Sequence, residues 1–492
     1  MLRKIFDSPW FYFALAILLA IGGVLSQFRR TVVEAPSGGL EEVLPGDGQR
    51  EFNVLFILID TLRADRLSSY GYARETSPNI DALADRGIRF AHVESQSSWT
   101  KASMASLWTG LYPQRTGVMR FPHALPAEAV MPAEIFKEAG YRTAGIWRNG
   151  WVANNFGFDQ GFDLYYRPNK NRPVANVKRN NPSAHALVGT DLDSTESASE
   201  FILGAGGEPF FLYVHYMDVH QYLYADSSPE YGSSFSDIYD SAIHWTDQNV
   251  GMLVEVLARA GLLDKTWIII AADHGEAFFE HGGEGHATNL YGEVTQVPLV
   301  IAPPIALDPS IVIEDRVANV DIWPTVLDLV GLPPLPNAEG RSLVPLVVEA
   351  AGLGEAPDEL RDRPLFSQLD RSWGRDTRDP DPMISIIKDD FRMLYRQSRP
   401  GKVEMYDKTS DPAEQKNVAA NQSERAVALS KEIDAFLQAP IAWGETPTIE
   451  IDAMREAQLR ALGYVVHATR KRDPERPEEA KTTQPRKKWG DD

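Results

Sequence analysis

Short apolar runs recur along the first three quarters of the chain, each about the length of one strand. The clearest is Asn53–Ile59 (NVLFILI), which is rich in β-branched residues and stops abruptly at Asp60. Similar runs occupy Tyr141–Ile146, Phe210–Val214, Trp267–Ala272 and Val297–Ile301. Strands that are apolar at every position are typical of a sheet whose two faces are both covered by helices.

Helical periodicity lies between these runs. It is clearest over Asn79–Arg86, Ala133–Ala139 and Ile238–Arg259. The alternation of strands and helices predicts an α/β fold with a doubly wound, mostly parallel sheet. Ligands bind such sheets at the carboxyl ends of the strands, so polar residues that directly follow a strand are candidates for the site.

The pattern changes near residue 380. Short apolar stretches separated by turns then predict strands over Met383–Ile387, Phe391–Arg396 and Val403–Tyr406, followed by an amphipathic helix over Glu424–Leu437. We therefore predict a main domain over 51–380 and a small antiparallel α+β subdomain over 381–465. The charged, proline-containing segment 466–492 predicts a disordered tail.

An uncharged apolar segment, Trp10–Phe28, follows a short N-terminal flank (1–9). As a helix it would span about 28 Å, close to the roughly 30 Å of a bilayer's hydrocarbon core. It is longer than the apolar region of a signal peptide, and no small-x-small cleavage site follows it. We expect a retained single-pass anchor in the cell membrane, a linker over 29–50 and an extracytoplasmic main domain. A cleaved signal peptide is the alternative.

Composition narrows the functional classes. Hydrophobic residues make up 43% and charged residues 24% of the chain, as in ordinary globular proteins. The formal net charge of −20 argues against a nucleic-acid partner, because phosphate contacts need clustered cations. The chain has no cysteine, which excludes disulfides and thiolate metal sites. The oligomeric state stays open.

Two aspartates follow predicted strands, Asp60 and Asp273, and His274 comes directly after the second. A single aspartate after a strand is more often a turn former or helix cap. Two of them at strand ends of one sheet, one with a neighbouring histidine, predict a divalent metal site. Oxygen and imidazole ligands suit Ca²⁺, Mg²⁺, Mn²⁺ or Zn²⁺. Whether one or two ions bind stays open.

Thr100 lies just before a predicted short helix, Lys101–Trp108. Threonine in this position is either a helix N-cap or a nucleophile whose hydroxyl a metal activates. The free N–H groups of the helix N-terminus would also favour a bound anion. Spacing alone leaves the two interpretations about equal.

The chain resembles the sulfatase family from about residue 50 to 465. The opening NVLFILIDTLRADRLSSYGY, followed by TSPNIDALADRGIRF, is highly specific for that family. Further matching segments follow in order: YPQRTGV, AGYRTAGI, FGFDQGFD, PFFLYVHYMDVH, ADHGEAFFEHG, LYGEVTQVPLVI, VDIWPTVLDLVGL, EGRSL and EMYDKTSDPAEQKNVA. The resemblance implies an alkaline-phosphatase-like fold, a catalytic domain over 51–380, and a metal-dependent hydrolase or transferase acting on an anionic phosphate or sulfate ester.

The nucleophile position departs from the family pattern. Sulfatases carry Cys or Ser, converted to formylglycine, at the start of C/S-x-P-S-R-x-x-x-L-T-G. Matching the final T-G to Thr109-Gly110 places Thr100 first, retains Ser103, and puts Ala102 and Met104 at the proline and arginine. Threonine is not a known precursor of formylglycine, so none is expected. A threonine nucleophile resembles the superfamily's nucleotide phosphodiesterases and lipid-headgroup phosphotransferases, and we therefore prefer a phosphoester substrate.

The resemblance implies roles for further residues. Asp60, Asp273 and His274 match metal ligands, and Thr100 completes the set. His220 matches a histidine that contacts the substrate anion, and His286 lies where a general acid would protonate the leaving oxygen. The candidate substrate-binding residues are Arg148, Lys101 and Asp218, and Asp218 and His281 are the weaker candidates.

Two other functions stay open at this point. The first is an arylsulfatase-like sulfuric ester hydrolase, because proteins with this overall pattern are usually sulfatases. The second is a catalytically inactive, membrane-anchored binding or scaffold protein, because Met104 and Ile146 stand where the family has an arginine and a lysine.

Overall fold

The computed structural model describes residues 36–45, 52–168, 177–179, 189–374 and 378–450. The predicted membrane segment Trp10–Phe28, its flank and the predicted tail 466–492 lie outside these ranges. Among the helices that the structure describes, none combines the length and apolar character needed to cross a membrane.

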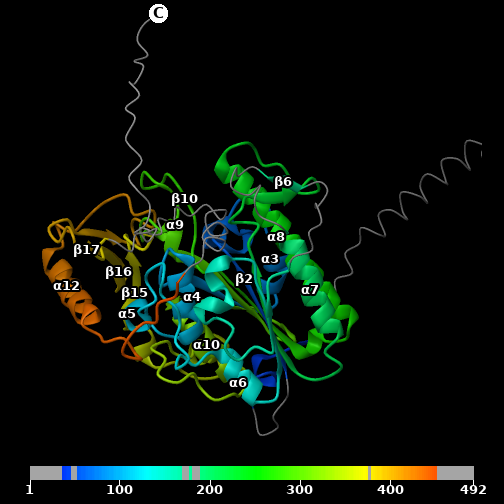
Figure 1. The fold of residues 1–492 in the computed structure, drawn as a ribbon. Coiled ribbons are helices and arrows are strands. Elements are labelled where there is room, and N and C mark those ends of the chain that lie inside the picture. Colours follow the sequence, from blue (N-terminus) through cyan, green and yellow to red (C-terminus); the bar gives the residue numbers. More distant parts are fainter. Residues whose placement is uncertain (1–35, 46–51, 169–176, 180–188, 375–377, 451–492) are drawn as a thin grey trace, which may run out of the picture.

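An eight-stranded sheet forms the centre of the molecule (Figure 1). β12 is antiparallel to both of its neighbours, and every other neighbouring pair is parallel. The predicted α/β, mostly parallel architecture is therefore confirmed. In spatial order the strands are β14 (Ile311–Ala318), β3 (Ile88–Glu94), β12 (Gln296–Ala302), β9 (Thr266–Ala271), β2 (Asn53–Ile59), β7 (Phe210–Tyr216), β4 (Arg142–Ile146) and β5 (Leu164–Tyr166).

Helices cover both faces of this sheet, which explains why its central strands are apolar throughout. All seven residues of β2 are buried. The rings of Trp323 and Trp108 pack edge-on against Phe56 of β2 from one face. That face carries α4 (Thr100–Thr109), α6 (Pro132–Glu138) and α10 (Ile322–Leu329); α3 (Pro78–Ala84), α7 (Asp191–Leu203) and α8 (Phe235–Arg259) lie on the other (Figure 1).

A second, antiparallel sheet packs beside the main domain, with one helix on its outer side (Figure 1). It contains β15 (Leu365–Asp370), β16 (Pro382–Lys388), β17 (Phe391–Arg396) and β18 (Glu404–Asp407), and the helix is α12 (Ser423–Leu437). The subdomain begins earlier than predicted, because β15 lies within 51–380 and yet pairs along its whole length with β16.

Part of the predicted linker is folded onto the main domain. β1 (Ser37–Gly38) pairs with β13 (Ala306–Leu307), and the side chains of Leu40 and Val43 are buried. The interpretation of 29–50 as a linker throughout is therefore wrong for residues 36–45, where two apolar side chains leave water.

Shorter elements complete the edge of the sheet at which the parallel strands end. A small hairpin pairs β10 with β11, and β6 pairs with β8 (Figure 1). The remaining bounds are β6 (Val177–Arg179), β8 (Leu223–Ala225), β10 (Ala277–Phe278), β11 (Glu284–Gly285), α5 (Pro113–Thr116), α9 (Gly292–Thr295) and α11 (Val344–Ala350).

Candidate active site

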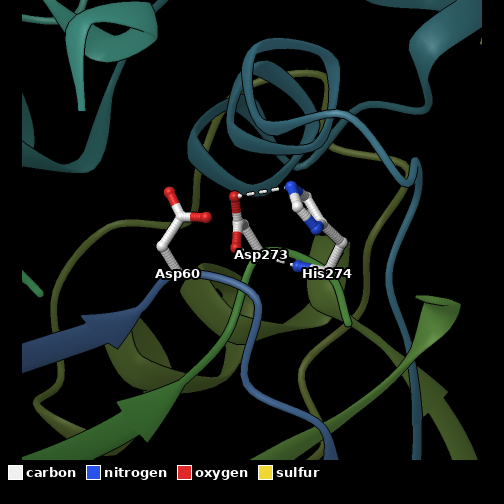
Figure 2. Close-up of side chains that lie close together, drawn as sticks. All are labelled: Asp60, Asp273 and His274. Carbon is white, nitrogen blue, oxygen red and sulfur yellow. Dashed lines mark hydrogen bonds and ion pairs between the residues drawn. The ribbon is translucent and has the colours of Figure 1, made fainter. Parts of the chain in front are cut away.

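Asp60 and Asp273 leave the sheet from adjacent parallel strands. β2 and β9 pair in register at Leu58 and Ala271, so both aspartates emerge at one edge. Figure 2 shows the two carboxyl groups turned toward one another, with the imidazole of His274 beside them. Asp60, Asp273 and His274 therefore lie together at the ends of β2 and β9, as their positions after predicted strands indicate.

Thr61, directly after Asp60, connects the two aspartates through hydrogen bonds. The backbone N–H of Thr61 donates to Asp273 Oδ1 at 3.1 Å, and the Thr61 hydroxyl donates to the Asp60 carbonyl oxygen at 2.6 Å. Thr61 has a φ of 63°, in the left-handed region that β-branched residues rarely occupy. Strained backbone of this kind concentrates at functional sites, and here it directs an N–H group at a carboxylate.

The donor set fits a divalent cation. Ligand atoms of Asp60, Asp273 and His274 all lie within 4.8 Å of one another, and all three residues are buried. Asp60 Oδ1 and Asp273 Oδ2 are buried without a hydrogen-bond partner in the described part of the chain. Buried carboxylate oxygens without donors are costly unless a cation neutralises them. Two carboxylates and one imidazole are ligands for hard or borderline ions.

The two carboxyl groups have opposite pKa shifts, although both are buried. Burial and the negative charge of Asp60 raise the pKa of Asp273. Burial acts in the same direction on Asp60, but the nearby His220, His215 and His274 outweigh it and hold its pKa well below the ordinary value. The pair therefore carries an electrostatic repulsion that a bound cation would relieve.

Thr100 is the first residue of α4 and not its cap. Trp99 occupies the N-cap position with extended backbone, and no side chain caps the helix. Thr100 Oγ1 lies 3.1 Å from His274 Nε2. Ser103 fixes the helix here by donating its hydroxyl to the Asp273 carbonyl oxygen at 2.6 Å. The interpretation of Thr100 as an ordinary N-cap is thus wrong, and its hydroxyl faces the imidazole of His274.

Two further residues reach the same oxygens and were missed in the sequence. Asn149 Nδ2 donates to Asp60 Oδ2 at 2.6 Å and lies 3.4 Å from Thr100 Oγ1. His215 Nε2 lies 3.1 Å from Asp60 Oδ2, while its Nδ1 lies 2.7 Å from the Tyr213 hydroxyl. A histidine inside the apolar strand FFLYVHY was an available signal, because buried polar side chains need partners. Asn149 carried no comparable signal.

His286 and His220 face each other beside this group. The ring of His286 lies with its centroid 4.6 Å from that of His274 and 4.9 Å from that of His220. His286 Nδ1 is 3.1 Å from Glu276 Oε1, across the base of the β10–β11 hairpin. Both candidate catalytic histidines therefore lie beside the metal-ligand group, and His286 pairs with Glu276, which sequence reasoning missed.

The two histidines have opposite electrostatic surroundings. Burial lowers the pKa of His220 to about 4. Burial would also lower the pKa of His286, but the Glu276 carboxylate outweighs it and raises that pKa. His286 is the better proton donor of the two near neutral pH.

Arg148 and Asp218 lie together but are directed at each other. Arg148 forms an ion pair with Asp218 and another, of 2.8 Å, with Asp191, and donates to the Gly189 carbonyl oxygen at 2.8 Å. Asp218 also accepts from Trp245 Nε1 at 2.8 Å. Both are buried. The charges of Arg148 and Asp218 are thus neutralised within a buried network, whose other members come from segments distant in the sequence.

Lys101 points away from the metal-ligand group. Its Nζ donates to the carbonyl oxygens of Phe121 and His123 at 2.6 and 2.8 Å. It lies 3.8 Å from the centroid of the Phe156 ring and 5.0 Å from that of Trp151. The ammonium group of Lys101 is thus enclosed by carbonyl oxygens and aromatic faces, and its predicted role in substrate binding stays a prediction.

His281 belongs to a different group, with Glu293 and Glu414. His281 Nδ1 lies 2.9 Å from Glu293 Oε1. Arg392 and Lys408 already neutralise Glu414, each at 2.6 Å from its Oε1. Two paired cations make this group a poor cation site, and His281 acts as a structural contact between the main domain and the subdomain.

Comparison with known proteins agrees with this geometry. A family model described as Sulfatase matches residues 52–332, more than half of the chain, and one described as N-sulphoglucosamine sulphohydrolase, C-terminal, matches 285–439. Human N-acetylgalactosamine-6-sulfatase is 27% identical over 371 residues, covering 64% of this chain and 67% of the relative.

Solved structures share the fold. A phosphonate monoester hydrolase from Agrobacterium radiobacter superposes with a TM-score of 0.63 at 21% identity, covering 78% of this chain and 95% of that one. A 2-O GAG sulfatase superposes with a TM-score of 0.65 at 20% identity, covering 79% and 93%. The predicted alkaline-phosphatase-like architecture is confirmed by these neighbours.

Proposed function

The chain belongs to the sulfatase family and is an ester hydrolase of the alkaline-phosphatase superfamily, and we propose that it cleaves phosphate esters with Thr100 as the nucleophile. The observation that carries the proposal is the position of the Thr100 hydroxyl, 3.1 Å from His274 Nε2 at the N-terminus of α4. A threonine there supplies a hydroxyl directly, whereas formylglycine chemistry starts from Cys or Ser.

Asp60, Asp273 and His274 would hold the divalent ion, and the two carboxylate oxygens without hydrogen-bond partners support this assignment. Bound there, such an ion would supply Lewis-acid chemistry, polarising an ester oxygen and activating the neighbouring hydroxyl. Asn149 orients the Asp60 carboxylate by donating to Oδ2, and His215 approaches the same oxygen from β7.

In the chemical step, Thr100 is the nucleophile and His286 is the general acid. The Thr100 oxygen attacks phosphorus and releases its proton to solvent as the new O–P bond forms. The bond from phosphorus to the leaving oxygen breaks, and the protonated imidazole of His286 donates a proton to that oxygen. Water, or an acceptor alcohol if the enzyme is a transferase, then attacks phosphorus. The bond from phosphorus to the Thr100 oxygen breaks, and the proton lost by the attacking group restores the Thr100 hydroxyl.

A sulfuric ester hydrolase is the second candidate function. Two observations favour it, the family assignment and the sulfatase names of the relatives. The experiment that separates the two measures turnover of an aryl phosphate monoester, an aryl phosphate diester and an aryl sulfate on one metal-loaded sample. Faster phosphate turnover supports the proposal, and turnover of the sulfate alone would overturn it.

We also propose that Trp10–Phe28 anchors the enzyme in the cell membrane, with the catalytic domain outside the cytoplasm. The support is the length and apolar character of that segment in the sequence. Full-length protein should stay in the membrane pellet in high salt and alkaline carbonate and should dissolve in detergent. Release by salt would contradict the anchor.

A further inference from the structure

A small basic cavity lies between the segment that follows His286 and the C-terminal sheet. It has a volume of about 200 Å³. Beside it, Tyr291 donates its hydroxyl to Glu404 of β18 at 2.6 Å. Its charged lining is unexpected on a chain whose formal net charge is −20. The lining includes Arg371, Arg396, Arg399, Lys402, Glu404 and Thr288.

The positive charge of this cavity is only partly neutralised. Arg396 pairs with Asp381. For Arg371, Arg399 and Lys402, no ion pair with a carboxylate occurs among the residues that the structure describes. Burial, Arg396 and Arg399 lower the pKa of Arg371, although the Asp381 carboxylate acts in the opposite direction.

The one carboxylate in the lining does not offset these cations by pairing with them. Glu404 Oε2 accepts the hydroxyl groups of Tyr291 and Tyr406, at 2.6 and 2.9 Å. Arg371, Arg399 and Lys402 are exposed to solvent, which weakens their mutual repulsion, and an oxyanion between them would relieve the repulsion that remains. Arginine is well suited to this, because its planar fork matches phosphate and sulfate oxygens.

A second charged cavity does not have this excess of positive over negative side chains. That cavity, of about 500 Å³, is also lined by arginines and lysines but carries as many carboxylates. There Arg316 pairs with Asp390 at 2.7 Å and Arg361 pairs with Asp315 at 2.8 Å. Its charges neutralise one another, whereas those of the smaller cavity do not.

The lining of the basic cavity includes residues that lie close along the chain to the candidate active site. Arg371 Nε donates to the Thr288 carbonyl oxygen at 3.2 Å, and Thr288 is two residues after His286. Two residues of extended chain span at most about 7 Å. On the same wall, the Asn289 carbonyl oxygen accepts from Ser98 Oγ at 2.6 Å, two residues before Thr100.

We propose that Arg371, Arg399 and Lys402 bind a second anionic group of the substrate, a phosphate or sulfate remote from the ester that is cleaved. The substrate is then a polyanion, with one ester at Thr100 and another anionic group in the basic cavity. This inference rests on the proposed function of the Thr100 site, because it assigns the remote group to the substrate of that site.

Binding to a full-length Thr100→Ala variant tests the proposal without turnover. The probes are glucose 1,6-bisphosphate, glucose 6-phosphate and inorganic phosphate, titrated calorimetrically at one fixed ionic strength. We expect the bisphosphate to bind at least about tenfold more tightly than the monophosphate. Adding Arg371→Ala or Arg399→Ala should remove that advantage and leave monophosphate binding unchanged, and the Lys substitutions should retain part of it. One charged hydrogen bond is worth about 1.5–3 kcal/mol, and tenfold corresponds to about 1.4 kcal/mol.

Controls separate the alternatives. Lys431→Ala removes an exposed cation of α12, outside the cavity lining, and should leave the bisphosphate advantage intact. An equal loss with Lys431→Ala would overturn the proposal, as would equal affinity of the parent protein for mono- and bisphosphate. Inorganic phosphate binding that depends on Arg371 without any bisphosphate advantage would assign the cavity to a free anion and also overturn it. Wild-type turnover by Thr100→Ala would instead refute the proposed nucleophile and leave the binding result standing.

Discussion

The indole of Trp373 stacks on that of Trp99, with ring centroids 4.7 Å apart and planes inclined by 22°. Trp99 directly precedes Thr100, and Trp373 lies in the loop that follows β15 of the subdomain. Trp373 Nε1 also donates to the Ala287 carbonyl oxygen at 3.3 Å, directly after His286. One side chain of the subdomain therefore contacts the neighbours of both the proposed nucleophile and the proposed general acid.

Replacing Trp373 should lower kcat more than it changes KM. A displacement of about 1 Å between reacting groups can cost on the order of a hundredfold in rate. We expect Trp373→Ala to reduce kcat by roughly 10–100-fold. Trp373→Phe keeps an aromatic ring on Trp99 but loses the Nε1 donor, so its loss should be smaller. Steady-state kinetics on an aryl phosphate measures both.

Trp443→Ala is the matched control for this experiment, because Trp443 is another partly buried tryptophan of the C-terminal part of the chain. It should lower the thermal midpoint without a selective loss of kcat. If Trp373→Ala and Trp443→Ala reduce kcat equally at equal loss of stability, Trp373 has no positioning role.

The Asp273→Asn substitution should stabilise the metal-free protein and abolish its response to divalent ions. Asp273 is buried beside Asp60, and both burial and that charge raise its pKa, so its ionised form is unfavourable without a cation. In the parent protein, a divalent ion at a hundred times its Kd should stabilise the fold by about 2.7 kcal/mol. Thermal unfolding with chelator and with added Mg²⁺, Ca²⁺, Mn²⁺ or Zn²⁺ measures both effects.

Asp264→Asn serves as the control, since Asp264 is exposed and should alter neither the metal-free stability nor the metal response. A parent protein that gains no stability from any of the four ions would contradict the metal site. So would a metal response that survives in Asp273→Asn.

The central strands were predictable because helices bury them on both faces. The runs chosen for β2 and β9 agree with the structure within a residue or two at each end. β3 and β14 were missed, because their buried and partly exposed positions are mixed, and β14 shows only partial alternation. β15 was missed for another reason, since its polar Ser367 is buried by donating to the Ser95 carbonyl oxygen, a contact remote in sequence.

Local position predicted part of the site, because Asp60 and Asp273 directly follow predicted strands. Thr100, His220 and His286 were identified from the resemblance to the sulfatase family, since spacing alone left the role of Thr100 open. Lys101 and Arg148 looked like substrate-binding cations, but carbonyl oxygens enclose one and carboxylates pair with the other. Those partners come from segments that the fold alone brings close, so no spacing along the chain could have identified them.

Thr100→Ala should abolish ester cleavage while leaving metal binding detectable. Loss of a nucleophile costs on the order of a thousandfold or more in kcat. Thr100→Ser keeps a hydroxyl at the start of α4 and should retain measurable activity. Mass spectrometry of wild-type protein quenched during turnover should find a phosphate on the peptide that contains residue 100.

Thr109→Ala is the control from the other end of the same helix, where the hydroxyl donates to the Ala105 carbonyl oxygen at 2.7 Å. It should cost some stability and keep the chemistry. Unchanged activity in Thr100→Ala, with metal still bound, would rule out the nucleophile assignment.

Arg392 joins the two parts of the molecule through buried ion pairs. It contacts Glu94 of β3 at 2.9 Å and Glu414 of the subdomain at 2.6 Å, and it is fully buried. Lys408 also pairs with Glu414, at 2.6 Å. Burial alone would raise the pKa of Glu414, but Arg392 and Lys408 outweigh it and lower that pKa below 4.5.

This pairing predicts a loss of stability on acidification. Because the folded-state pKa of Glu414 is lowered, its contribution is present above about pH 4.5 and is lost as the pH falls through the folded-state pKa. Glu414→Gln leaves Arg392 and Lys408 with less counter-charge, which should cost about 3–5 kcal/mol at pH 7. Urea unfolding at several pH values should show the difference between parent and variant shrinking below pH 4.5. The exposed Glu128→Gln variant should follow the parent at every pH, and a Glu414→Gln deficit that is independent of pH would show that the ion pairs do not cause it.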